Sequence, residues 1–144
     1  MVSIANIPKL AHFFWGASPM SYCRFLTLKT FRKFNPDWEM KLYRIKVSFP
    51  GKWESEEICD ITHYKGCDYS TFIPELNVEI ITLPEDKFKE MGDLSPPHMA
   101  DLLRWELLYE HGGLWSDMDI LYTKPIKELE CIDLPSADVY FPLY

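Results

Sequence analysis

The segment from Gly112 to Leu121 reads G-G-L-W-S-D-M-D-I-L, and the interpretation of the whole chain starts from it. Its two glycines are typical of a helix end, because glycine readily adopts the left-handed backbone that closes a helix. The residues before it, from S-P-P at 95–97 to His111, predict the helix itself, since proline is favoured in a first turn. The apolar residues after the glycines predict a strand over 114–122.

The acid pair Asp117 and Asp119 lies inside this predicted strand. Because side chains alternate along a strand, we expect both carboxylates on one side of it and Met118 on the other. Mg²⁺ and Mn²⁺ prefer carboxylate oxygens and keep positions open for water or substrate phosphates. A solvated turn is the ordinary alternative for two aspartates at this spacing, but uncompensated carboxylates within an apolar strand would be costly. The pair therefore predicts a site for a divalent cation and a diphosphate.

Three other chemistries that use paired carboxylates fit this segment less well. A calcium-binding helix–loop–helix site needs an oxygen ligand and a glycine where the chain has Leu121 and Tyr122. A phosphatase with an aspartyl nucleophile carries its motif on an early strand, whereas only 25 residues follow Asp119. Glycoside hydrolysis needs two carboxyl groups on opposite sides of the scissile bond, which a pair on one side of one strand does not supply.

Strands and helices alternate along the rest of the chain. Strands are predicted over 9–15, 38–44, 77–83 and 137–141. The first helix is predicted over 18–34, with Ser18-Pro19 supplying the N-cap and a first-turn proline. Residues 45–76 show no sustained period and predict only short helices or loops, and 84–91 predicts a short amphipathic turn or helix. This order predicts one α/β domain over residues 1–144 with a largely parallel sheet.

The composition is that of a globular protein, with 47% hydrophobic, 26% charged and 15% aromatic residues in a chain of 144. A net charge of −7 argues against nucleic acid as a partner, because nucleic acids are bound largely by charge neutralisation. The sequence predicts no transmembrane segment, and Pro8 interrupts a start that lacks a signal-peptide core. The 4 dispersed cysteines are expected to be reduced, so we expect a cytoplasmic protein.

Cys59, His63 and Cys67 form a C-x3-H-x3-C spacing. Structural zinc sites usually have four ligands, often in paired knuckles, and this spacing supplies three. Buried thiols and a surface histidine are the simpler interpretation. A small zinc-binding interaction module stays open as a further alternative.

The residues from Ala100 to Asp119 read A-D-L-L-R-W-E-L-L-Y-E-H-G-G-L-W-S-D-M-D. This segment resembles the sugar-binding region containing the DXD motif of glycosyltransferase family 32, and it is more distantly similar to the glucosylating domain of large clostridial toxins. The start of the chain, with I-P-K at 7–9, H-F-F-W-G at 12–16 and N-P-D-W at 35–38, looks like the N-terminal strand, helix and strand of the same family.

The resemblance implies a Rossmann-like GT-A nucleotide-sugar-binding fold and a metal-dependent retaining glycosyltransferase of the hexosyltransferase type. Such an enzyme moves a sugar from a nucleotide-diphosphate sugar to a glycan or other hydroxyl acceptor, with Mn²⁺ or Mg²⁺ as its cofactor. By the same resemblance, Asp117 contacts the donor sugar or ribose, and Asp117 and Asp119 hold the metal. Asp101 and Arg104 hold the donor sugar hydroxyls, and Trp15 stacks on the nucleobase. It assigns no catalytic residue.

The residues by themselves leave alternatives for several of these roles. Asp101 and Arg104 are three positions apart on a helix, which is also the spacing of an ordinary surface ion pair. Trp15 on a strand is more often a core residue, although the carboxyl end of a strand is where α/β folds bind ligands. His111 is expected to interact with the helix dipole. His98, Trp105 and Trp115 are expected to be packing residues, with Trp115 standing where the family usually has tyrosine.

The sequence stops soon after its last predicted strand, whereas the family continues with an acceptor-side segment, so we expect a truncated chain. The expected role is donor binding in glycan or capsule assembly. A non-catalytic nucleotide-sugar-binding fragment is the nearest alternative. The sequence does not distinguish uracil from guanine as the base.

Overall fold

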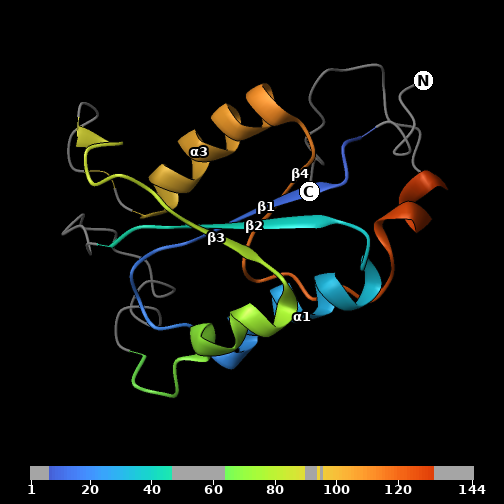
Figure 1. The fold of residues 1–144 in the computed structure, drawn as a ribbon, viewed down its shortest axis with the longest axis horizontal. Helices are drawn as coiled ribbons and strands as arrows, with labels where there is room; N and C mark the ends of the chain where they lie inside the picture. Colours follow the sequence, from blue (N-terminus) through green and yellow to red (C-terminus); the bar gives the residue numbers. More distant parts are fainter. Residues whose placement is uncertain (1–6, 47–63, 90–93, 95, 132–144) are drawn as a thin grey trace.

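A computed structural model describes residues 7–46, 64–89, 94 and 96–131 of the chain. They form a parallel sheet of four strands with helices on both faces (Figure 1). In chain order the elements are β1 (Leu10–Trp15), α1 (Tyr22–Phe34), β2 (Glu39–Arg44), the 3₁₀ helix η2 (Tyr69–Leu76), β3 (Glu79–Thr82), α3 (Pro96–His111), β4 (Leu114–Ser116) and the 3₁₀ helix η4 (Ile126–Cys131). The predicted α/β class with a parallel sheet is therefore confirmed.

The strands lie in the order β3-β2-β1-β4, and every neighbouring pair is parallel. The chain thus lays β2 and β3 on one side of β1 and then returns to place β4 on the other side. β1 pairs with β2 along its whole length but with β4 only from Ala11 to Phe13. Ligands of open α/β sheets bind at the carboxyl ends of the two strands where the order reverses. Here these two strands are β1 and β4.

Two hydrophobic clusters fill the space on either side of the sheet. β1 alternates between them, because Phe13 and Trp15 pack on the α1 side and Phe14 packs on the α3 side. On the α1 side, the ring of Phe31 meets Phe13 edge to face, with 5.4 Å between the ring centroids. The helix contribution on the other side comes from Met99, Leu103 and Leu107 of α3. The sheet therefore holds both helices at fixed positions relative to its carboxyl end.

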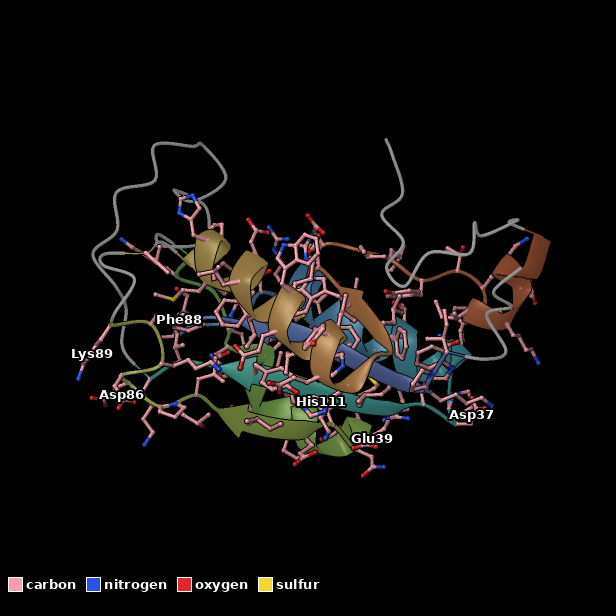
Figure 2. All side chains as sticks on the ribbon, turned by 90° about the horizontal axis from the view of Figure 1, so that it is seen from above. Asp37, Glu39, Asp86, Phe88, Lys89 and His111 are labelled. Atoms are coloured by element: carbon pink, nitrogen blue, oxygen red, sulfur yellow. The ribbon has the colours of Figure 1, made fainter. Side chains whose placement is uncertain are left out.

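Figure 2 labels residues near the two opposite ends of the sheet. Asp37 and Glu39 lie at the amino end, and Asp86, Phe88 and Lys89 lie at the opposite end, beyond β3. α3 runs back from the carboxyl end to the amino end, where His111 closes it (Figure 2). The first half of α3 is therefore near the carboxyl ends of the strands.

The return from α3 to β4 depends on its two glycines. Gly112 and Gly113 both have positive φ, +64° and +92°, and the Gly112 N–H donates to the Leu108 carbonyl as in a helix C-cap. A Cβ on Gly113 would collide with the carbonyl oxygen of Leu10, so only glycine lets β4 lie beside β1 without strain. The predicted helix end is confirmed.

The first helix begins later than predicted. α1 starts at Tyr22, with Ser21 as its N-cap, and not at Ser18-Pro19. Long-range hydrogen bonds hold the preceding segment outside the helix: the Ser18 carbonyl accepts from Arg44 Nη2 at 3.2 Å, and the Met20 N–H donates to the Asp68 carboxylate at 2.8 Å. These bonds come from tertiary structure, which local capping rules do not include.

The fourth strand is also shorter than predicted. β4 ends at Ser116, so the expected strand over 114–122 is wrong beyond that residue. The chain then turns at Met118 and crosses toward α1, where the Tyr122 N–H donates to Thr30 Oγ1 at 3.1 Å. The strand predicted over 137–141 lies outside the described residues. Among the residues that are described, no helix has the length and apolar character needed to cross a bilayer.

Candidate functional site

The carboxyl ends of β1 and β4 bring together most of the predicted site residues. Trp15 is the last residue of β1, and Asp117 follows directly after the last residue of β4. Asp119 comes two residues later, in the turn that leaves the sheet. Asp101 and Arg104 lie near the middle of α3, which covers the face of the sheet opposite α1 (Figure 1). These residues form two contact groups, one on each side of the sheet.

The first group, here the Arg104 cluster, consists of Asp101, Arg104, Trp115 and Asp117. Arg104 Nη2 lies 3.2 Å from Asp117 Oδ1 and 3.4 Å from Asp101 Oδ1, so one guanidinium nitrogen joins both carboxylates. Trp115 Nε1 also donates to Asp117 Oδ1, at 2.9 Å, and the Arg104 guanidinium carbon lies 5.4 Å from the centre of the Trp115 ring. Asp101 and Arg104 do form the ion pair that their spacing left open as an alternative, and Arg104 also ties this pair to the DXD segment.

Arg104 keeps hydrogen-bonding capacity within this cluster. Its Nε is buried and makes no hydrogen bond in the described structure. A buried donor without a partner is costly unless a ligand or water satisfies it. Arginine presents its donors as a rigid planar fork that suits paired oxygen acceptors. The cluster is therefore chemically able to bind a polyhydroxyl or anionic group.

The second group, here the Arg24 cluster, consists of Trp15, Arg24 and Asp119. Arg24 Nη1 lies 3.7 Å from Asp119 Oδ2, and the Arg24 guanidinium carbon lies 5.8 Å from the centre of the Trp15 ring. All three residues line a pocket of about 330 Å³ together with Pro19, Ser21, Cys23 and Tyr64. The pocket joins the end of β1, the start of α1 and the turn after β4.

The two aspartates therefore do not act as neighbours on one strand. Asp117 engages α3 through Arg104, whereas Asp119 engages α1 through Arg24. The expectation that strand alternation places both carboxylates on one side is wrong, because the strand ends before Asp117. Met118 between them is buried in the cluster on the α1 side and fixes the turn. The acid pair spans the end of the sheet, with one carboxylate toward each helix.

Some of the oxygen atoms at this end of the sheet are suitable ligands for a divalent cation. The described residues contain no group of three or more His, Cys, Asp or Glu side chains that could hold a metal ion. Mg²⁺ is nevertheless often bound by one or two carboxylates together with substrate phosphates, and Mn²⁺ accepts the same oxygen donors. Asp119 is exposed and makes one loose ion pair, whereas one oxygen of Asp117 already accepts from both Arg104 and Trp115. Asp119 is therefore the better placed of the two for a metal.

Two charged residues outside the pocket lining, Arg44 and Asp68, hold the segment that follows β1 in place. Arg44, the last residue of β2, donates to the Gly16 carbonyl at 3.0 Å and to the Ser18 carbonyl at 3.2 Å. Asp68 accepts from the backbone N–H groups of Met20 and Ser70. Burial opposes the ionisation of Asp68, but these hydrogen bonds and the nearby Arg44 outweigh it and lower its pKa. The segment between β1 and α1, which contributes Pro19 and Ser21 to the pocket, is thus held by a charged network.

His12 is buried in β1, three residues before Trp15, and its ring contacts the end of α3 instead of the pocket. Its Nε2 is 3.0 Å from the Gly112 carbonyl, and its Nδ1 is 3.3 Å from the Tyr43 hydroxyl. Burial lowers the pKa of His12, and burial together with Glu79 and Glu39 raises the pKa of Tyr43 to about 12. A neutral His12 that donates to Gly112 and accepts from Tyr43 satisfies all three groups. His12 therefore supports the helix end and not the pocket.

Sequence reasoning missed two residues of the site and misread others. No role was predicted for Arg24, and its place near the amino end of α1 was the available signal. Trp115 was expected to be a packing residue, but its indole also holds Asp117. Trp105 and His98, expected to pack, are exposed. For the zinc alternative, Cys59 and His63 lie outside the described residues, and Cys67 is exposed.

Open parallel α/β sheets bind ligands at the carboxyl ends of their strands, and the acidic pair with its two arginines lies at this position. The family model described as the glycosyltransferase sugar-binding region containing DXD motif matches residues 24–134. The chain belongs to this family, which confirms the resemblance found in the sequence. A comparison with curated proteins finds no significant sequence match.

A solved structure shows the same fold. The structure named PaToxG Glycosyltransferase superposes with a TM-score of 0.50 at 19% sequence identity. The match covers 83% of this chain and 45% of that one, so this chain corresponds to slightly less than half of that structure. The likeness confirms the predicted Rossmann-like, GT-A type of fold.

Proposed function

We propose that this chain binds the donor of a metal-dependent, retaining glycosyltransferase. The donor is a nucleotide-diphosphate sugar, and the acceptor is a hydroxyl group of a glycan or another molecule. The observation that carries the proposal is the convergence of the Arg104 cluster and the Arg24 cluster at the carboxyl ends of β1 and β4. Membership in the DXD-motif family supports the same conclusion.

Each cluster suits one part of such a donor. The Arg104 cluster has a guanidinium fork and two carboxylates, which suit the several hydroxyl groups of a sugar. Within it, Arg104 and Asp101 bind sugar hydroxyls, and Asp117 binds the sugar or the ribose. The Arg24 cluster has an aromatic ring and a carboxylate in one pocket. There Trp15 stacks on the base, and Asp119 is the main ligand of the metal.

In this proposal the metal acts on the diphosphate, and the protein side chains position the sugar. A bound Mn²⁺ or Mg²⁺ neutralises charge on the diphosphate, which makes the nucleoside diphosphate a better leaving group. The Arg104 cluster orients the sugar relative to that diphosphate, and such orientation lowers the barrier to transfer.

The metal role of Asp119 is tested by Asp119→Asn. Asp119 has a side chain that is 57% exposed and makes one ion pair at 3.7 Å, so its loss should change stability by less than about 1 kcal/mol. Asp37→Asn is a matched control, because Asp37 is also 57% exposed and pairs with one basic residue, Lys9. Asp37 lies at the amino end of the sheet, away from the pocket (Figure 2).

Titration calorimetry with UDP and GDP, with and without Mn²⁺, gives the readout. We expect Mn²⁺ to strengthen binding of one of the two nucleotides to the wild-type chain and to the Asp37→Asn variant. We expect no such strengthening in Asp119→Asn. Retention of the full Mn²⁺ effect in Asp119→Asn would remove Asp119 from the metal site, and failure of the wild type to bind either nucleotide would refute the proposed function.

Binding of a nucleotide sugar without transfer is the second candidate. It is favoured because both described clusters suit the donor. Release of nucleoside diphosphate from a bound nucleotide sugar, measured with and without added acceptor, separates the two candidates. Turnover supports the transferase, and tight binding without release supports the second candidate.

A further inference from the structure

Arg24 stands between two groups that the proposed function assigns to the donor. Its guanidinium carbon lies 5.8 Å from the centre of the Trp15 ring, and its Nη1 lies 3.7 Å from Asp119 Oδ2. Its side chain is only 22% exposed, and all three residues line the same pocket. The guanidinium therefore lies between the proposed base platform and the proposed metal ligand.

A nucleoside diphosphate has the same order of parts. Its ribose lies between the base and the diphosphate, and the oxygens of the diphosphate bind a metal. With the base on Trp15 and a metal at Asp119, the first phosphates would pass the position of Arg24. Among the described residues that line the pocket, Arg24 is the one with a positive charge. In a chain with a net charge of −7, a dianionic ligand needs such a local cation.

A bound donor would also take away both present contacts of Arg24. The base would cover the face of Trp15, and the metal would occupy the carboxylate of Asp119. A largely buried guanidinium that loses its anionic partner is destabilised unless another anion replaces it. A phosphate is a suitable replacement, because its oxygens match the planar fork of arginine.

The local backbone favours the same ligand. Arg24 lies in the first turn of α1, which has no acidic residue, and Ser21 at the N-cap also lines the pocket. The amino end of a helix carries a partial positive charge that adds to the charge of the guanidinium. Both the side chain and the helix therefore place positive potential at this end of the pocket.

We propose that Arg24 is a ligand of the donor diphosphate and that it exchanges its ion pair with Asp119 for the phosphate when the donor and metal bind. This inference rests on the proposed function, since it names a residue for the phosphate part of the same ligand. It differs from the roles proposed above because the residue comes from α1 and belongs to neither the DXD segment nor α3.

The test compares Arg24→Gln with Lys29→Gln. Both variants remove one positive charge from α1, but Lys29 is exposed and is not among the residues that line the pocket. Each variant is titrated with UDP and GDP in the presence of Mn²⁺ and, separately, with the uncharged nucleosides uridine and guanosine. We expect Arg24→Gln to weaken binding of the preferred diphosphate roughly 10- to 150-fold, which is the range for a hydrogen bond to a charged group.

Further arms of the experiment keep the proposal open to refutation. Nucleoside affinity should not fall in Arg24→Gln, and Lys29→Gln should bind both ligands like the wild type. Arg24→Lys keeps the charge without the fork and should lose several-fold in diphosphate affinity, which covers the case in which the glutamine variant fails to fold.

Three results would overturn the proposal. Unchanged diphosphate binding in Arg24→Gln would reduce the Arg24–Asp119 contact to a surface ion pair. Tighter diphosphate binding would show that Arg24 only blocks the pocket. An equal loss for nucleosides and diphosphates would show that Arg24 only supports Trp15. Failure of the wild type to bind any nucleoside diphosphate would instead refute the proposed function, and this inference would fall with it.

Discussion

Substituting lysine for Arg104 separates a sugar-binding role from a purely structural one. Arg104 contacts Asp117, Asp101 and the Trp115 ring through one guanidinium. Lysine keeps the positive charge, but it lacks the planar fork and the flat face that lies over the indole. Arg104→Lys therefore keeps the electrostatics of the cluster and removes its geometry.

The effect on folding stability should be small. The two carboxylates that Arg104 contacts are 55% and 62% exposed, so each ion pair contributes about 0.2–1 kcal/mol and lysine keeps part of it. The contact with the Trp115 ring adds about 0.5–1 kcal/mol at an exposed site. We expect the free energy of unfolding to fall by less than about 1.5 kcal/mol.

The effect on donor binding should be larger and specific to the sugar. A hydrogen bond from a charged group contributes about 1.5–3 kcal/mol, so losing one at a sugar hydroxyl lowers affinity roughly 10- to 150-fold. The assay is calorimetry of a nucleotide sugar and of the matching nucleoside diphosphate, both with Mn²⁺, beside urea unfolding of the same variant. The affinity for the diphosphate alone should stay unchanged in Arg104→Lys. If both ligands bind as they do to the wild type, or if both weaken equally, Arg104 does not read the sugar.

Two further predictions concern the helix end that positions β4. Gly113→Ala places a Cβ against the carbonyl oxygen of Leu10 at a φ of +92°, so the free energy of unfolding measured in urea should fall by at least about 2 kcal/mol. In Gly112→Ala the Cβ would lie 3.3 Å from the Pro8 side chain, and the free energy of unfolding should fall by only about 1 kcal/mol. Equal losses in the two variants would contradict the close approach of Gly113 to Leu10. Burial lowers the pKa of His12 in the folded chain below the value of 6.5 for a free histidine, so the unfolded chain binds more protons than the folded chain as the solution becomes acidic. The free energy of unfolding should therefore fall as the pH drops from 7.5 to 5.5. This fall should be smaller in the His12→Gln variant.

Local sequence signals were sufficient for the layered architecture. The runs at 9–15 and 38–44 correspond to β1 and β2 within one residue at each end, and 77–83 contains β3. The helix predicted from 95–97 to His111 corresponds to α3, because both of its ends carry strong signals. These elements have the clearest hydrophobic patterns and end residues, and the packing of the chain agrees with them.

The prediction failed where long-range hydrogen bonds decide the local conformation. Ser18 and Ser21 are equally good N-cap residues, and the bonds from Arg44 to the Ser18 carbonyl and from the Met20 N–H to Asp68 select the second. The apolar residues after Ser116 fit a strand, but β1 pairs with β4 over three residues only, and Thr30 draws the chain toward α1. Partners this distant in sequence cannot be read from a local pattern.

The spacing of the acid pair has a different structural basis from the one the sequence suggested. The residue between the two aspartates, Met118, is buried in the cluster on the α1 side and holds the turn against the sheet. Asp117, before it, stays with Arg104 on the α3 side, and Asp119, after it, reaches Arg24 on the α1 side. A spacing of two therefore serves to place one carboxylate on each side of the sheet end, beside a different arginine. An elongated ligand that crosses this edge would thus meet an aspartate and an arginine on each side of the sheet, and the buried Met118 fixes the position of one aspartate relative to the other.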